Sequence, residues 1–146
     1  MKTSYFAKFS RLPKEEKSRF MPILISTSLP KWFLNSEEYY IEYKTLAPSR
    51  NNVFNLKNDY ISQEDFTNAY LDKLKGLDME QILEDIYDLE GITDSEVIFL
   101  CYEKSDDFCH RHILREYLNE NFNTNITELG IDWLYPFTFN KITGII

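Results

Sequence analysis

The sequence predicts an α/β fold, in one domain built on a mainly parallel sheet of about four or five strands flanked by helices. Two observations carry this prediction. Short apolar, β-branched runs alternate with longer segments of helical periodicity. In addition, the run Val97–Leu100 has the continuous apolar pattern of a strand that is covered on both faces. With 146 residues the chain is large enough to bury a core without disulfide staples.

Composition and charge exclude several classes of protein. Hydrophobic residues make up 43% of the chain, which argues against disorder, and 4 glycines with neither a GxGxxG nor a GxxxxGK[ST] motif disfavour a classical dinucleotide or P-loop site. The net charge of −8 would repel a phosphate backbone, so duplex nucleic acid is not an expected partner. Without a signal-peptide core or a run of membrane-spanning length, the chain is expected to be cytoplasmic, with reduced cysteines and no membrane contact.

Two strands are predicted in the first thirty residues. Thr3–Phe9 alternates in the manner of a strand, and Pro22–Ser28 contains a fully apolar run that ends in a polar cluster. The hydroxyl groups of Ser26 and Ser28 would emerge at the end of this second strand, where they could bind a ligand or could simply form a turn.

The stretch 30–60 is loosely patterned and rich in aromatic residues. One short helix is predicted to begin at Ser36 and to end before Pro48. Irregular stretches of this length often serve as lids, and the aromatic side chains could either stack on a planar ligand or belong to the core. Arg50 is a candidate cation for ligand binding, although a solvated loop residue would look the same.

Two helices with clear start signals follow. Ser62 and Asp65 form a capping-box pattern before the first, and Asp78 stands in the same position before the second. Gly76 separates the helices, and Gly91 is expected to end the second one. Their charged faces are typical of solvated surface, so no chemistry is assigned to them.

The candidate functional residues cluster between positions 97 and 118, which hold both cysteines and both histidines of the chain. Cys101 and Glu103 fall at the end of the Val97 strand, on one side of its pleat. Cys109, His110 and Arg111 fall in the first turn of the next predicted helix, beside unpaired backbone N–H groups. Open α/β sheets bind ligands at such strand ends, so the sequence predicts a site here.

The remaining elements complete the predicted sheet. Asp106 and Asp107 are expected to cap the helix, and Ile126–Ile131 is expected to be the last strand of a right-handed βαβ crossover. The tail 133–146 is too apolar to be free in water. It is therefore expected to pack on the domain or on a second copy, which would make a homodimer.

The motifs LCYEK and FCHR resemble the signature of the family called domain of unknown function 488. Four further blocks agree with that family, so that the resemblance covers most of residues 3–131: TSYFAKF, ILIST with a following proline, LAP and ITEL. The resemblance implies a compact α/β domain and brings no settled activity. Many relatives carry a basic residue after the second strand, where this chain has Thr27, Ser28 and Leu29. The site residues that the resemblance implies are Cys101, Glu103, Cys109, His110 and Arg111.

The first functional hypothesis is an enzyme or binding protein for a small anionic ligand, nucleotide-like or phosphate-bearing. The helix N-terminus and Arg111 would hold the anion. Cys109 would have a lowered pKa and act as the nucleophile, with Glu103 as acid or base and His110 assisting. The sequence specifies neither a cofactor nor the reaction.

Two further hypotheses remain open. Zinc could be held by Cys101, Cys109 and His110, with Glu103 or His112, although the spacing matches no standard structural zinc pattern.

Alternatively the cluster is structural, with buried cysteines and a Glu103–Arg111 ion pair that ties the strand to the helix. Such a protein would act by binding a partner through its acidic surface or its tail.

Overall fold

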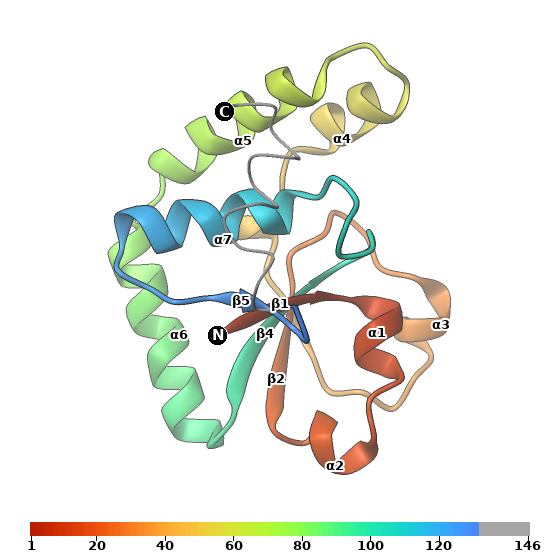
Figure 1. The fold of residues 1–146 in the computed structure, drawn as a ribbon, viewed down its shortest axis with the longest axis vertical. Coiled ribbons are helices and arrows are strands. Elements are labelled where there is room, and N and C mark those ends of the chain that lie inside the picture. Colours follow the sequence, from red (N-terminus) through yellow and green to blue (C-terminus); the bar gives the residue numbers. More distant parts are fainter. Residues whose placement is uncertain (132–146) are drawn as a thin grey trace.

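The structure, a computed structural model, describes residues 1–131 and contains a five-stranded sheet whose paired strands are all parallel (Figure 1). The strand order is β3-β2-β4-β1-β5. The predicted α/β class with a parallel sheet of four or five strands is therefore confirmed. The predictions for the tail 133–146 lie outside the described residues. The strands are β1 (Lys2–Tyr5), β2 (Phe20–Leu24), β3 (Ile41–Glu42), β4 (Glu96–Cys101) and β5 (Thr127–Glu128).

Helices cover both faces of the sheet, so the molecule has three layers (Figure 1). On one face, α5, α6 and α7 pack against the strands, and α4 packs on α5. On the other face, α1 and α3 supply the buried aromatic rings. The helices are α1 (Phe6–Ser10), α2 (Lys14–Lys17), α3 (Lys31–Leu34), α4 (Arg50–Lys57), α5 (Gln63–Lys75), α6 (Met79–Thr93) and α7 (His110–Asn121), with a 3₁₀ turn η1 (Lys44–Leu46).

Strand β4 lies at the centre of the sheet and accounts for this layering. Its side chains alternate: Val97, Phe99 and Cys101 enter the core under α5–α7, whereas Ile98 and Leu100 enter the core under α1 and α3. All five are 0% exposed. The predicted doubly covered strand is thus confirmed.

The start signals of α5 and α6 act as predicted. The Ser62 hydroxyl accepts a hydrogen bond from the Asp65 backbone N–H in a complete capping box, and the Asp78 carboxylate caps α6. The prediction that Gly91 ends α6 is wrong. The helix runs on to Thr93 and ends at Asp94, which adopts the left-handed conformation with φ 50°, a conformation that aspartate tolerates better than most residues.

The first predicted strand is too long. Strand β1 stops at Tyr5, and the chain turns at once into α1. Phe6 and Phe9 are three residues apart, so one helical turn places both in the core. The second predicted strand, Pro22–Ser28, begins two residues earlier than expected and ends at Leu24.

The sequence predicted a helix that begins at Ser36 and ends before Pro48, and this prediction is wrong. That stretch instead contains β3, which pairs with β2 through Ile23 and Ile41, and then η1. Helix α4 was also not predicted; its N-cap Ser49 accepts a hydrogen bond from the Asn52 backbone N–H.

Strand β5 is shorter than the predicted strand Ile126–Ile131 and pairs with β1, so it is separated from β4 by one strand. Among the described residues, no helix has both the length and the apolar character needed to cross a bilayer.

Candidate functional site

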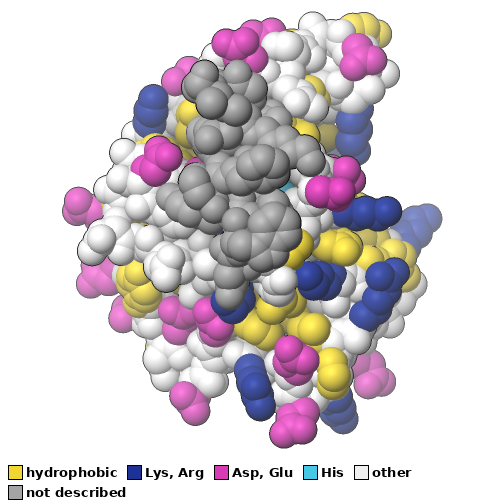
Figure 2. Space-filling model, viewed as in Figure 1, with side chains coloured by type: hydrophobic (Ala, Val, Ile, Leu, Met, Phe, Trp, Pro, Cys, Tyr) yellow, Lys and Arg dark blue, Asp and Glu magenta, His cyan; other side chains and the backbone are white. Residues whose placement is uncertain are grey.

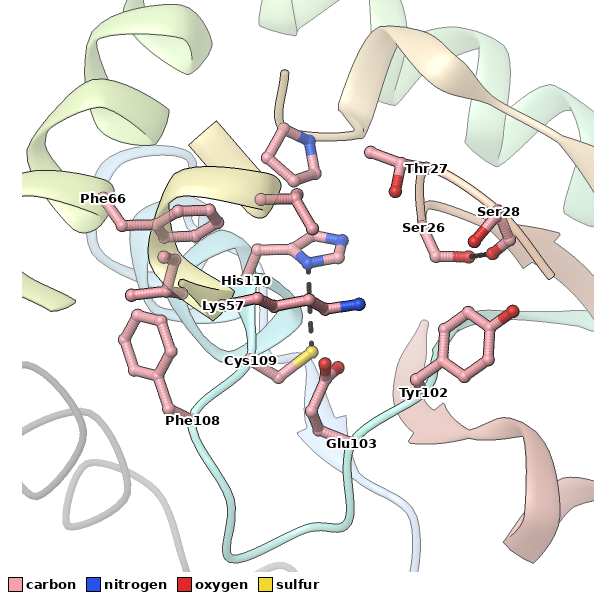
Figure 3. Close-up of a pocket in the computed structure, with 13 residues that line it drawn as sticks. Ser26, Thr27, Ser28, Lys57, Phe66, Tyr102, Glu103, Phe108, Cys109 and His110 are labelled. Atoms are coloured by element: carbon pink, nitrogen blue, oxygen red, sulfur yellow. Dashed lines mark hydrogen bonds between the residues drawn. The ribbon is translucent and has the colours of Figure 1, made fainter. Parts of the chain in front are cut away.

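A pocket opens where β2 and β4 end, beside the first residues of α7 (Figure 3). Its volume is about 90 Å³, several times what one water molecule needs, so it admits one end of a small ligand. Parallel sheets commonly bind ligands at this edge. Five parts of the chain line the pocket: residues 26–28, Pro48 with α4, Phe66 of α5, residues 102–103, and residues 108–110.

The polar wall of the pocket is formed by residues that follow the neighbouring strands β2 and β4. Ser26, Thr27 and Ser28 follow β2, and Tyr102 and Glu103 follow β4 (Figure 3). Ser26 and Ser28 follow the end of β2, as predicted, and line the pocket together with the first residues of α7. The Ser26 hydroxyl already donates to the Ser28 carbonyl oxygen, so this side chain shapes the turn as well as the pocket.

The opposite wall is apolar, and a lysine crosses the space between the walls. Phe66 and Phe108 contact each other edge to face with ring centroids 5.7 Å apart, and Val53 and Leu56 extend their surface. The exposed Lys57 extends from α4 across this space, and its amino group points toward the side of Ser26 and Tyr102 (Figure 3). Sequence reasoning missed Lys57, because α4 lies in a stretch whose pattern is irregular. Ser49 followed by apolar residues at 53 and 56 was the available signal.

Cys109 is the N-cap residue of α7, and His110 is the first residue of the helix. The predicted capping by Asp106 or Asp107 is wrong, because both lie in the exposed loop before the helix. Cys109 makes no side-chain capping hydrogen bond. Cys109 and His110 both line the pocket, so the positive end of the α7 dipole lies at its wall.

The position of the proton on His110 follows from its contacts. Nε2 lies 2.6 Å from the carbonyl oxygen of Ile25, which can only accept a hydrogen bond, so Nε2 carries the hydrogen. In the neutral ring Nδ1 then has a free electron pair, and it lies 3.9 Å from the sulfur of Cys109. The ring of Tyr70 packs edge-on against His110, with centroids 5.5 Å apart.

The predicted lowering of the Cys109 pKa is wrong. Burial raises the pKa of this thiol well above its ordinary value of 9.0, and the thiol of Cys101, 3.1 Å away, adds to the increase. The charges of Arg111 and His110 act in the opposite direction but are outweighed. Cys109 is only 2% exposed, so the thiolate would lose nearly all of its hydration. This loss destabilises the thiolate more than the charges of Arg111 and His110 stabilise it.

The structure does not bring Arg111 to the pocket. Its guanidinium is fully buried and forms two hydrogen bonds with Glu128, from Nε to Oε1 at 3.1 Å and from Nη2 to Oε2 at 2.8 Å. Arg111 therefore cannot contact a ligand in the pocket, although the first hypothesis predicted that it would. It also does not form the ion pair with Glu103 that the structural hypothesis predicted. The predicted binding residue Arg50 is exposed at the start of α4 and does not line the pocket.

Arg111 belongs to a buried ionic cluster between α7, β1 and β5, in which Glu128 is the central acceptor. Thr3 and Ser105 each donate a hydroxyl to this carboxylate, and Arg115 lies 3.5 Å from it. Burial alone would raise the pKa of Glu128, but the charge and hydrogen bonds of Arg111 lower it to about 2.

His112 packs beside this cluster and away from the pocket. Its Nδ1 accepts a hydrogen bond of 2.8 Å from Nη1 of Arg115. Burial and the charges of Arg111 and Arg115 lower the pKa of His112 to about 2, so the ring is neutral. The zinc hypothesis included His112 as a possible ligand beside the two cysteines, but the structure places it in the ionic cluster with Arg115 instead.

Residues 6–122 match a family model described as "Active DUF488-N3 subclade", in which DUF488 stands for domain of unknown function 488. The matched range includes the whole pocket and both cysteines. No curated protein and no solved structure matches the chain significantly.

Proposed function

The chain belongs to the domain of unknown function 488 family, and from this premise we propose that it binds a small anionic, nucleotide-like ligand in the pocket at the ends of β2 and β4. One observation carries the proposal. The pocket has an aromatic wall and a polar wall, with the amino group of Lys57 between them (Figure 3). Ligands with a planar apolar part and a charged part fit such a division.

Each part of the ligand has a matching contact. A planar ring would pack on Phe66 and Phe108, and the anionic group would pair with Lys57 next to the N-terminus of α7. Although the net charge is −8, Lys and Arg side chains gather on the right side of Figure 2, the side where α1, α3 and α4 lie in Figure 1. Local positive charge of this kind favours the approach of an anion.

Glu103 is the acid or base in this proposal. Of the described residues that line the pocket, it alone carries a carboxylate, and Figure 3 shows it directed toward Lys57 and Cys109. His110 lines the same space and assists. The raised pKa of Cys109 argues against a free thiolate nucleophile, so we leave nucleophilic attack by Cys109 out of the proposal. A cytoplasmic location is also part of the proposal, supported by the low cysteine content of the chain, two in 146 residues.

Calorimetric titration with nucleoside monophosphates, nucleoside diphosphates and sugar phosphates tests the proposal. We expect one class to bind, and Lys57→Ala to weaken that binding by about tenfold or more, the value of a charge-assisted hydrogen bond. Lys75→Ala is the matched control, because Lys75 is exposed at the end of α5 and does not line the pocket. Binding that both variants weaken equally, or no binding in the panel, would count against the proposal.

A further inference from the structure

Three buried side chains with metal-binding atoms meet at the inner wall of the pocket. Cys101 ends β4, Cys109 is the N-cap of α7 and His110 follows it, and one donor atom from each lies within 4.8 Å of the other two. Their exposed fractions are 0%, 2% and 8%. Because two thiols and an imidazole are ligands that zinc prefers, this cluster differs from the acidic surface groups that often lie together without an ion.

The spacing of the donors suits a tetrahedral zinc ion. Metal–ligand distances of about 2.0–2.3 Å place neighbouring ligand atoms about 3.6–3.8 Å apart. Nδ1 of His110 lies 3.9 Å from the Cys109 sulfur, the Cys101 sulfur lies 3.7 Å from Nε2 of the same ring, and the two sulfurs are 3.1 Å apart. Binding through Nδ1 therefore requires the sulfurs to separate by less than about 1 Å, and it requires the Cys101 side chain to rotate so that its sulfur moves from the Nε2 edge of the His110 ring toward the Nδ1 edge.

The histidine is also oriented as a ligand. Nε2 donates its hydrogen to the Ile25 carbonyl, so the free electron pair of Nδ1 is on the side of the Cys109 sulfur. Zinc-binding histidines usually donate their second ring nitrogen in this way, which fixes the ring and its tautomer. The hydrogen bond to the Ile25 carbonyl oxygen thus fixes the His110 ring, and with it the metal-binding atom Nδ1, before any metal binds.

We propose that Cys101, Cys109 and His110 bind a zinc ion whose fourth position faces the pocket. Cys109 and His110 line the pocket, whereas Cys101 closes the site from the core. Three protein ligands with one open position are typical of catalytic zinc sites, in which the fourth ligand is water or substrate. Binding Zn²⁺ replaces the protons of two thiols, so two protons are released for each ion bound. This inference does not depend on the anionic ligand proposed above.

Metal analysis and cobalt substitution test the inference. Protein purified without chelator should contain about one zinc ion per chain. After chelation, added Co²⁺ should produce a thiolate-to-cobalt charge-transfer band that saturates at one equivalent, and Zn²⁺ should release two protons in weakly buffered solution. Zinc should also protect both thiols from a disulfide reagent. Absence of the band, or thiols that react equally with and without zinc, would overturn the proposal.

Two variants separate this inference from the proposed ligand function. Cys101→Ser should lose the cobalt band but keep the pocket lining, because Cys101 does not line it. Lys57→Ala should keep full cobalt binding, because a lysine ammonium has no free electron pair. Far-ultraviolet circular dichroism checks that each variant is folded. A band that persists unchanged in a folded Cys101→Ser variant would show that these residues are not the site.

Discussion

The neutral, buried His112 should make the protein sensitive to mild acid. Folding lowers its pKa from the ordinary value of 6.5 to about 2, first through burial and then through the charges of Arg111 and Arg115. Between these pH values the unfolded chain binds a proton that the folded chain does not, so stability decreases as the pH falls. Integrating from pH 7 to pH 5 gives a loss of about 2 kcal/mol from this one residue.

Urea unfolding at pH 7 and pH 5 measures this loss, and His112→Asn supplies the comparison. The asparagine carbonyl can accept the hydrogen bond that Arg115 donates to Nδ1, but it does not titrate. The wild-type free energy of unfolding should therefore fall by about 2 kcal/mol more than that of the variant over this interval. Equal losses would refute the reasoning. So would an NMR titration in which the His112 ring of the folded wild-type protein gains its proton near pH 6.5.

Three other predictions concern stability and reactivity. Glu128→Gln should lower the free energy of unfolding by about 3–5 kcal/mol, because it leaves two buried arginines without their central carboxylate; denaturant unfolding that shows a change below about 1 kcal/mol would contradict the role given to this residue. Ser62→Ala should cost about 1 kcal/mol by removing the capping box of α5, and a thermal melt identical to that of the wild type would count against it. In protein from which metal has been removed by a chelator, alkylation of Cys109 by iodoacetamide, followed by mass spectrometry, should still accelerate above pH 9, because burial raises the pKa of the thiol. A rate that levels off below pH 8 would be the opposite result.

The elements with local signals could be predicted from the sequence. The apolar run of β4 and the caps at Ser62 and Asp78 determine structure within a few residues, and these predictions are confirmed. Alternation over a few residues is weaker evidence. The pattern at Thr3–Phe9 fits a strand throughout, yet the spacing of Phe6 and Phe9 also fits one helical turn, and only the core beneath α1 decides between them.

The candidate site could be predicted only in part. Cys101, Glu103, Cys109 and His110 lie together as expected, because a short loop joins the end of β4 to the start of α7. The partner of Arg111 could not be found in this way. Glu128 is 17 residues away, and it reaches Arg111 only because β5 pairs with β1. Long-range ion pairs of this kind are set by the sheet order, which local patterns do not specify.

The central position of β4 has a consequence for folding during synthesis. The strands β1 and β2 are neighbours in the sequence, but they never pair with each other, because β4 lies between them in the sheet. The ribosome must therefore make about two thirds of the chain, as far as Cys101, before either strand receives this partner. Until then the backbone N–H and C=O groups along the edges of β1 and β2 that face β4 have no strand partner, and only β4 can supply one.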